Sequence, residues 1–503
     1  MMILRYIFLF CTLIFMVACN SSEKLPPYEY GSGREKLPEL TLFNHDKIMK
    51  DLLGPAPIDV KTIGILVYEG ANTMEVIAPM AVFSEMMSVK IDYIATKKGD
   101  VKTTLATIEV SKALDDVNEL DLLIVPGGNK QGLLETMANP KIIEWITTTD
   151  KQTKLSAGIG SGVYILAKSV GLAGKQLSLP WYKAKENASL IDVQYSRERY
   201  IKDGKYYTCV GHTASIDMSL AMLGDIAGSP NLEGAMLDME YDPQPPLEGG
   251  LPELTTDSIL NRAMLHHFDI DGLQFINDQK IQSSTDIVNI GILVYPDFFT
   301  LDAIGPLVVL SQLPNVHVEL ISTGDKSIKS GRTYFGVDKN IAGVNQLDVL
   351  LIPGGADGTW AVAQDQNILD WIKHIDHNSR LTSSVCTGSW VLGSAGLLEA
   401  RRASTNWYRA AQMMERYGAT FTGDRYTIDG KYWTSAGVSA GIDMSFAMIQ
   451  YFAGDDGTKH AMLNLAYHPQ PPIEGGSPEK TDDLVLDMMH QMYDYLMAPL
   501  IKK

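Results

Sequence analysis

The sequence predicts two tandem α/β domains, each a three-layer sandwich with helices on both faces of a mostly parallel β-sheet. Three observations indicate this fold class. The two halves of the 503-residue chain repeat each other. Within each half, apolar strand-like runs alternate with helical patterns. Turns of small residues follow several of these runs, at the strand ends where such sheets carry their sites.

The repeat is read from short segments of near identity. Ile63–Tyr68 matches Ile290–Tyr295, and Asp121–Gly128 matches Asp348–Gly355. The later matches pair Asp203–Tyr206 with Asp429–Tyr432, Ile216–Ser219 with Ile442–Ser445, and Tyr241–Pro246 with Tyr467–Pro472. A one-residue gap accounts for the whole alignment. We therefore expect domains at 59–272 and 286–503, each of roughly 210 residues.

The elements of the second half follow from hydrophobic patterning. We expect strands at 288–294, 317–322, 349–352 and 381–385, and helices at 301–313 and 368–375. Gly305-Pro306 should interrupt the first of these helices early. Sites in such sheets lie at the carboxyl ends of the strands. Three turns should therefore converge: the one after Tyr295, Pro353–Gly355, and the one at Cys386.

Cys386 follows the strand-like run Leu381–Val385 and precedes the small residues Thr387, Gly388 and Ser389. A strand, a sharp turn and a helix place one side chain at the apex, as in a nucleophile elbow. The following helix would point its N-terminal N–H groups at the sulfur, which predicts a lowered thiol pKa and a reactive thiolate. The same local pattern also fits a buried, inert core cysteine.

The motifs of both halves resemble those of the ThiJ/PfpI family, within the class I glutamine-amidotransferase-like superfamily. In the second half they are Leu301-Asp302-x-x-Gly305-Pro306, Leu351–Gly355, Ser384–Gly388, Arg401–Trp407, Asp429-Gly430 and Ala440–Asp443. The resemblance covers nearly all of both domains and implies a flavodoxin-like sandwich for each. The pattern is most similar to the isonitrile-hydratase-like branch, which also resembles the sensor halves of some AraC-type regulators.

The resemblance implies roles for individual residues. It makes Cys386 the nucleophile, assisted by Asp302 and Thr387. Backbone N–H groups around Gly354, Gly355 and Thr387 would hold developing negative charge. A carboxyl beside a thiolate is more stable protonated, so Asp302 would shuttle a proton. The alternatives are a helix N-cap for Asp302 and a plain tight turn for the glycines.

Two departures from the family pattern bear on the substrate. Thr387 stands where the protease branch has a histidine, so peptidase activity is not expected. Asn406 stands where many relatives have a histidine before the tryptophan, which makes Asn406 and Trp407 the candidate substrate-pocket residues.

The first half lacks this chemistry. Gly160 aligns with Cys386, and Glu75 aligns with Asp302. Without a thiol, this half should be inactive in covalent catalysis. Cys209 is expected to be a small core residue, and His212 a structural or incidental one. We expect the first half to pack on the second as a built-in partner, an intramolecular pseudo-dimer.

The N-terminus has the pattern of a lipoprotein signal peptide over 1–18. Arg5 precedes an apolar run, Tyr6–Val17, that ends at Ala18-Cys19 and resembles a bacterial lipobox. We expect cleavage before Cys19, lipidation of its thiol, and a location in the bacterial cell envelope, periplasmic or surface-facing. An uncleaved anchor or ordinary cleavage nearby are the alternatives. Residues 19–58, rich in proline, are expected to form an extended tether.

Composition limits the partners. The net charge of −18 argues against nucleic acid, because binding phosphates needs a basic surface. Four cysteines without a CxxC or His/Cys cluster predict no metal site and no cofactor. The function expected is a thiol-dependent hydratase or hydrolase acting on a small molecule. The competing hypotheses are a non-catalytic binding or scaffold lipoprotein and a redox-responsive thiol protein.

Overall fold

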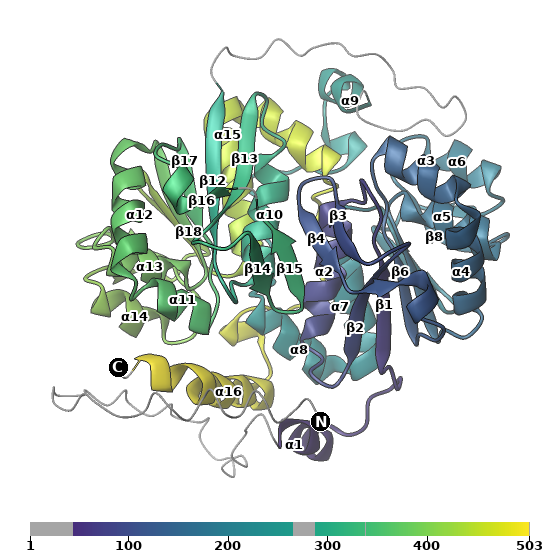
Figure 1. The fold of residues 1–503 in the computed structure, drawn as a ribbon, viewed down its shortest axis with the longest axis horizontal. Helices are drawn as coiled ribbons and strands as arrows, with labels where there is room; N and C mark the ends of the chain where they lie inside the picture. Colours follow the sequence, from purple (N-terminus) through teal and green to yellow (C-terminus); the bar gives the residue numbers. More distant parts are fainter. Residues whose placement is uncertain (1–43, 265–286, 338, 502–503) are drawn as a thin grey trace.

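The computed structural model describes residues 44–264, 287–337 and 339–501. The expected signal peptide, Cys19 and most of the tether lie outside these ranges. The chain forms two α/β domains side by side, each built on a seven-stranded sheet (Figure 1). The predicted fold class is confirmed.

The sheet of the first domain has the order β10-β11-β7-β6-β1-β2-β5, and only the edge strand β10 runs antiparallel. Its strands are β1 (Thr62–Leu66), β2 (Lys90–Ala95), β5 (Lys112–Ala113), β6 (Leu122–Val125), β7 (Leu155–Ile159), β10 (Tyr200–Asp203) and β11 (Tyr206–Cys209). The face toward the second domain carries α2 (Thr73–Ser84) and α7 (Ala214–Ala227), and the outer face carries α3 (Lys130–Ala138), α4 (Pro140–Asp150) and α5 (Gly162–Val170) (Figure 1).

The second domain repeats this topology as β16-β13-β12-β17-β18-β22-β21. Its strands are β12 (Val288–Val294), β13 (Val316–Ser322), β16 (Lys339–Asn340), β17 (Val349–Ile352), β18 (Leu381–Val385), β21 (Tyr426–Asp429) and β22 (Tyr432–Ser435). The inner helices are α10 (Thr300–Leu310) and α15 (Val438–Asn464), and the outer ones are α11 (Asp357–Val362), α12 (Gln366–Asn378), α13 (Gly388–Ser394) and α14 (Ala410–Arg416).

The predicted strands of the second half are present within one residue of their expected ends. All four residues of β17 are buried, as expected for a parallel strand covered on both faces. The interruption expected at Gly305-Pro306 is wrong, because α10 continues through both residues. Packing explains this: a Cβ on Gly305 would lie 2.9 Å from Cγ1 of Ile442, so glycine lets α10 and α15 approach closely.

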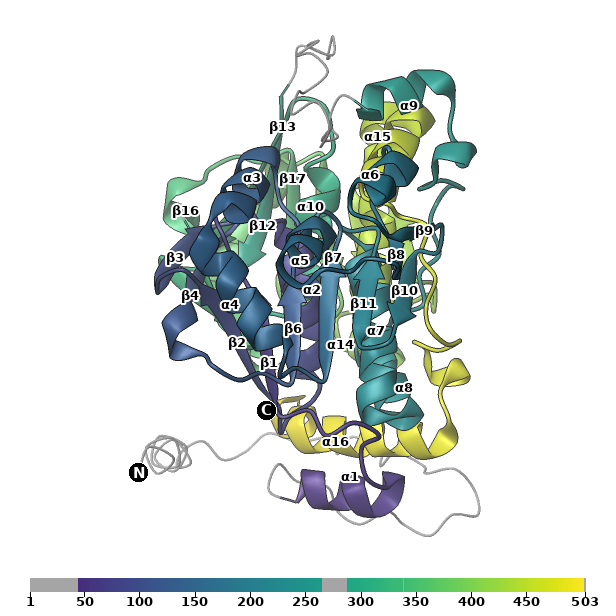
Figure 2. The same cartoon turned by 90° about the vertical axis from the view of Figure 1, so that its right-hand side faces the viewer.

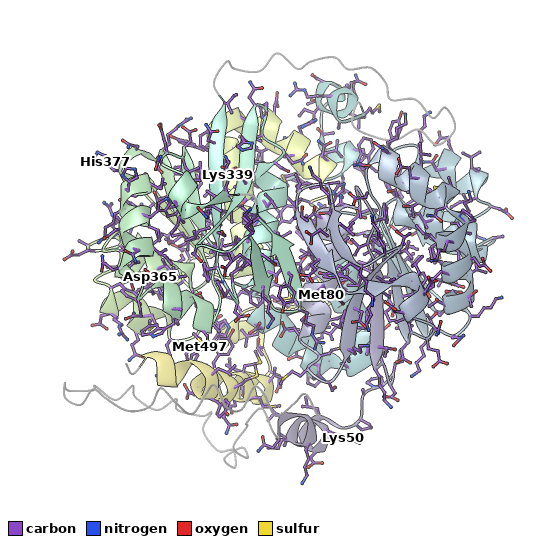
Figure 3. All side chains as sticks on the ribbon, in the orientation of Figure 1. Lys50, Met80, Lys339, Asp365, His377 and Met497 are labelled. Atoms are coloured by element: carbon purple, nitrogen blue, oxygen red, sulfur yellow. The ribbon has the colours of Figure 1, made fainter. Side chains whose placement is uncertain are left out.

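The two domains are joined by packed helices and by a β-sheet to which both contribute strands. Helices α2 and α10 pack against each other at the centre, where Met80 of α2 is labelled in Figure 3. A four-stranded sheet, β14-β15-β4-β3, takes β3 (Gly99–Lys102) and β4 (Thr107–Val110) from the first domain and β14 (Ser327–Ser330) and β15 (Thr333–Gly336) from the second. Strand β15 pairs with β4, and Tyr93 Oη lies 2.8 Å from Thr333 Oγ1 across the same boundary.

Each domain ends with a helix that lies on the other domain. Helix α9 (Asp257–Met264) packs on α15, and α16 (Asp483–Ile501) packs on α8 (Ser229–Asp238). Figure 1 shows α16 running beneath the second domain. These two helices therefore lie at opposite ends of the boundary between the domains.

The last part of the expected extended tether is helical. Helix α1 (His45–Leu53) lies below α16 (Figure 2), and its Lys50 side chain points away from the fold (Figure 3). The prolines of this region flank the segment rather than interrupt it, and Gly54 ends the helix at φ +82°. None of the helices within the described ranges is long and apolar enough to span a bilayer.

Candidate active site

Cys386 sits at a strand–turn–helix corner between β18 and α13. Its φ of +58° is left-handed, which is unusual for a residue with a side chain and typical of a strained turn. Its N–H donates to the carbonyl oxygens of Ser435 (3.0 Å) and Ala436 (2.6 Å). Small neighbours are required here, because a Cβ on Gly388 would lie 2.2 Å from the carbonyl oxygen of Ile352. The geometry presents the thiol at the carboxyl end of the sheet.

Asp302 lies in the first turn of α10 and points at this corner. It is 1% exposed, and its Oδ2 accepts the N–H of Gly354 (3.1 Å). A Cβ on Gly354 would lie 2.7 Å from Cys386 Cβ and 2.9 Å from Asp302 Oδ2, so the carboxyl lies beside the thiol residue. The N-cap of α10 is Phe299, so the helix-cap alternative for Asp302 is wrong. Burial raises the pKa of Asp302 well above its usual range. Burial therefore favours the protonated carboxyl, which is the form that can donate a proton.

The predicted lowering of the thiol pKa is wrong. Burial, and then the Asp302 and Glu240 carboxyls, raise the pKa of Cys386 well above its ordinary value. The N–H of Thr387 acts in the opposite direction but is outweighed. Helix α13 is only seven residues long, so its dipole competes poorly with desolvation and two acids. Burial thus favours the neutral forms of both the thiol and the neighbouring carboxyl.

The N–H groups of the two predicted glycines, Gly354 and Gly355, are hydrogen-bonded to side chains of the site. The N–H of Gly354 is bound to Asp302, and the N–H of Gly355 donates to Oγ1 of Thr387 (3.0 Å). The Thr387 hydroxyl in turn donates to the carbonyl oxygen of Gly355 (2.7 Å). The structure therefore brings Cys386, Asp302, Thr387 and both glycines together. The two glycine N–H groups thus hold the side chains of Asp302 and Thr387 in place.

Asn406 and Trp407, the predicted substrate-pocket residues, face the first domain. Oε1 of Glu240 accepts both the Nδ2–H of Asn406 and the N–H of Trp407, each at 3.0 Å. Glu240 is 8% exposed, and burial raises its pKa to about 8. This carboxyl, from the loop after α8, acts electrostatically on Cys386 and Asp302. Glu240 was not predicted from the sequence. The only hint there is that the two halves differ at this position, which Ala466 occupies in the second half.

Helix α16 closes the same side of the site. The Trp407 ring lies 4.9 Å from the ring of His490 and 5.0 Å from that of Tyr493. The Tyr493 hydroxyl donates to Asp238 of the first domain (2.6 Å). The second-domain site is thus bounded by its own sheet, by a loop of the first domain and by the C-terminal helix.

The equivalent corner of the first domain has been rebuilt around Glu75. Gly160 keeps the left-handed backbone of the elbow, with φ +54°. The Glu75 carboxyl accepts the N–H groups of Gly127 (2.7 Å) and His212 (2.9 Å). A Cβ on Gly160 would lie 2.7 Å from Oε1 of Glu75, so the longer acid occupies the space of the missing thiol side chain. Cys209 is fully buried nearby, as expected for a core residue.

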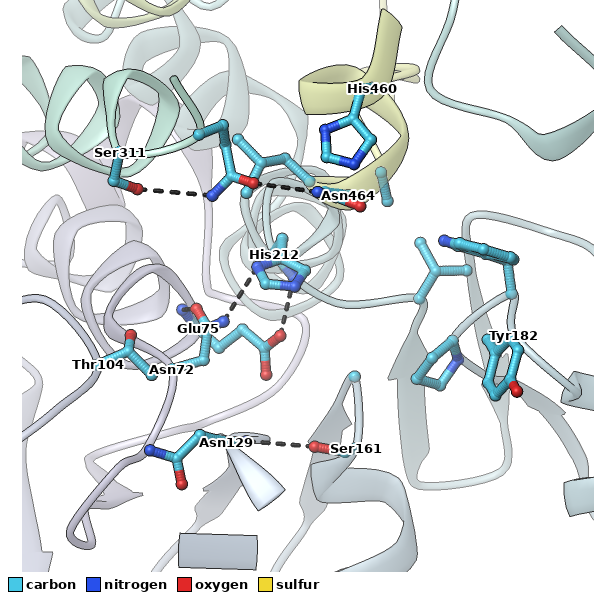
Figure 4. A pocket seen from close by; sticks show the side chains of 18 of the residues that line it. Asn72, Glu75, Thr104, Asn129, Ser161, Tyr182, His212, Ser311, His460 and Asn464 are labelled. Atoms are coloured by element: carbon cyan, nitrogen blue, oxygen red, sulfur yellow. Dashed lines mark hydrogen bonds between the residues drawn. The ribbon is translucent and has the colours of Figure 1, made fainter. Parts of the chain in front are cut away.

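A cavity of about 660 Å³ opens onto this rebuilt corner (Figure 4). Glu75, His212 and Gly160 line it from the first domain, and His460 and Asn464 line it from α15 of the second. Cys386 is not among its lining residues. Within the described residues, His, Cys, Asp and Glu side chains form no group of three or more able to hold a metal ion.

Comparison with known proteins identifies relatives of both halves. The sequence pattern of the DJ-1/PfpI family matches residues 61–224 and 288–451. Isonitrile hydratase of Pseudomonas putida is 36% identical over 206 residues, covering 40% of this chain and 87% of that protein. Protein DJ-1 homolog B of Arabidopsis thaliana is 20% identical over 420 residues, covering 79% and 89%. The crystal structure of a THiJ/PfpI family protein from Pseudomonas syringae is 26% identical, with a TM-score of 0.42, covering 45% and 95%.

Proposed function

The chain belongs to the DJ-1/PfpI family in two tandem copies, and we propose that its second domain is a cysteine-dependent hydratase that adds water to a small isonitrile. The observation that supports this proposal is the buried Asp302 carboxyl beside Cys386, which stands at the left-handed corner of the elbow. The similarity to isonitrile hydratase supports the substrate class.

The geometry suggests how the first step proceeds. Sulfur attacks the terminal isonitrile carbon while that carbon receives a proton, which gives a thioimidate bound to Cys386. Because both acids of the pair are neutral at rest, Asp302 passes its own proton to the carbon and receives the thiol proton. This exchange avoids a free thiolate in a buried site.

Water completes the reaction. Its oxygen bonds to the thioimidate carbon, one of its protons goes to the substrate nitrogen, and the C–S bond then breaks. The sulfur takes the second proton, so the products are an N-substituted formamide and the starting thiol. Thr387 acts as a positioning residue, because its hydroxyl ties the elbow to the Gly355 turn.

The activity is tested with the full chain and benzyl isocyanide, following N-benzylformamide by proton NMR. We expect turnover by the wild type and complete loss in Cys386→Ala, because no covalent intermediate can form. Cys209→Ala is the matched control, since Cys209 is remote from substrate and should leave turnover intact. No formamide from the wild type, or equal turnover by Cys386→Ala, would contradict the proposal.

We also propose that the first domain replaces the second copy of a homodimer. The shared four-stranded sheet and the reach of Glu240 to Asn406 support this role. A site that takes a residue from the neighbouring domain is incomplete without it. In this arrangement the first domain supplies part of the second domain's site.

We propose further that the chain is exported and anchored by a lipid on Cys19, with the membrane as its partner. The run from Arg5 to Ala18 supports this. Metabolic labelling with a fatty acid tests it. Cys19→Ser should lose the label, whereas Cys11→Ser, within the apolar run, should keep it. An unlabelled wild type would exclude the anchor.

A further inference from the structure

A cavity lies between the rebuilt corner of the first domain and the second domain. Its volume of about 660 Å³ lies within the range of small-molecule sites. The equivalent region of the second domain is filled: Glu240 occupies the place of Ala466, and Met413 that of Asn187. Both Ala466 and Asn187 line the cavity. The open space thus results from substitutions between two otherwise matched halves.

A hydrogen-bond acceptor without a donor lies in the wall of this space. Asn187 is 3% exposed, and its Nδ2 donates to the Tyr164 hydroxyl (3.1 Å) and the Tyr182 carbonyl (3.4 Å). The carbonyl contact fixes the orientation of the amide, so Oδ1 is an acceptor that has no partner among the described residues. A buried acceptor without a donor is costly, which makes this atom a docking point for an N–H or O–H group.

One donor faces the same space. Asn72 Oδ1 accepts the N–H groups of Met74 and Glu75, so its Nδ2 donates to Nδ1 of His212 (3.0 Å). The ring therefore carries its proton on Nε2. Burial lowers the pKa of His212 to about 4, which keeps the ring neutral. Figure 4 shows His212 and Glu75 together on one side of the cavity, with Tyr182 across from them.

Charged groups of both signs line the cavity. Glu75 and Asp456 are its acidic lining residues, and Lys130 and Arg262 its basic ones. Burial raises the pKa of Glu75 to about 7, so this carboxyl is only partly ionised at neutral pH. A strongly charged ligand would meet a like charge as well as an opposite one, whereas acceptors and a donor placed together suit an uncharged group that both donates and accepts.

From these observations we infer that the first domain binds a small, uncharged amide without covalent reaction. The amide N–H would donate to Asn187 Oδ1 or Glu75, its carbonyl would accept from His212 Nε2, and its substituent would lie against Trp181 and Tyr182. The inference does not depend on the activity of the second domain, although a formamide belongs to the same chemical class.

The test is a calorimetric titration of the full chain carrying Cys386→Ala, so that the second domain cannot react. N-benzylformamide is the probe, and benzylammonium and benzoate are its charged counterparts. We expect one formamide per chain and at least tenfold weaker binding of both ions. If either ion binds more tightly than the formamide, or if no formamide binds at millimolar concentration, the inference is wrong.

Two variants place the binding in this cavity. Asn187→Met and Ala466→Glu each copy the residue of the second domain and should weaken formamide binding at least tenfold. Asn378→Met, at the exposed end of α12, is the control and should bind as the parent does. Melting curves verify that each variant is folded. Binding that survives both cavity variants would overturn the assignment.

Discussion

Replacing Glu240 with glutamine should change the reactivity of Cys386 in a pH-dependent way. The amide keeps an oxygen that accepts from Asn406 and Trp407, so the shape of the site is retained. Only the charge is removed. Burial raises the pKa of Glu240 to about 8, so its carboxyl is about one-tenth ionised at pH 7 and about nine-tenths ionised at pH 9.

The magnitude follows from the interaction between two charges in one buried site. At an effective dielectric constant of about 20, such a pair interacts by about 2 kcal/mol. That energy raises a thiol pKa by about 1.5 units, or reduces the thiolate fraction about 30-fold. At pH 9 about one-tenth of the wild-type molecules have a neutral Glu240 and react at the full rate, whereas the others react about 30-fold more slowly. The variant, in which every molecule has a neutral side chain, should therefore react about eightfold faster. At pH 7 the two rates should agree within about twofold.

The assay is iodoacetamide alkylation of Cys386, measured by peptide mass spectrometry from pH 6.5 to 9.5. The exposed Glu253, replaced by glutamine, is the control and should leave the profile unchanged. Equal rates for wild type and Glu240→Gln at pH 9 would refute the electrostatic coupling between the domains. A difference as large at pH 7 as at pH 9 would show that the effect is structural.

Three further predictions concern the fold. Arg199→Met leaves the fully buried Asp217 without its ion-pair partner, so the free energy of unfolding should fall by about 3–5 kcal/mol. Denaturant titrations measure this loss, and an unchanged unfolding midpoint would contradict the prediction. Gly160→Ala places a Cβ at φ +54° against Glu75 and should cost about 2–3 kcal/mol, whereas Gly430→Ala, with open space around it, should cost about 1 kcal/mol. Equal losses would contradict the steric argument. Residues 286–503 expressed alone should form a homodimer or aggregate in sedimentation experiments, because the inner face of α10 loses its cover, and a stable monomer would argue against the built-in partner.

Local patterns were sufficient for the architecture. The repeat of Ile63–Tyr68 in Ile290–Tyr295 determined the number of domains, because a duplicated sequence folds into duplicated units. Buried runs such as Leu381–Val385 determined the strands, since a parallel strand covered on both faces needs a continuous apolar segment. The contrast between Gly160 and Cys386 also predicted that only the second half could form a covalent intermediate. Each of these inferences can be read from short segments of the sequence, without knowing which residues contact one another.

The chemistry of the site depended on residues that only folding brings together. Cys386 was expected to be acidic from its place before a helix, but burial and the Asp302 and Glu240 carboxyls raise its pKa instead. Glu240 lies 166 positions from Asn406 in the sequence, and no local pattern links the two. The cavity likewise arises where α15 of one domain faces the rebuilt corner of the other. Desolvation and electrostatic interactions act through space, so the tertiary structure alone decided them.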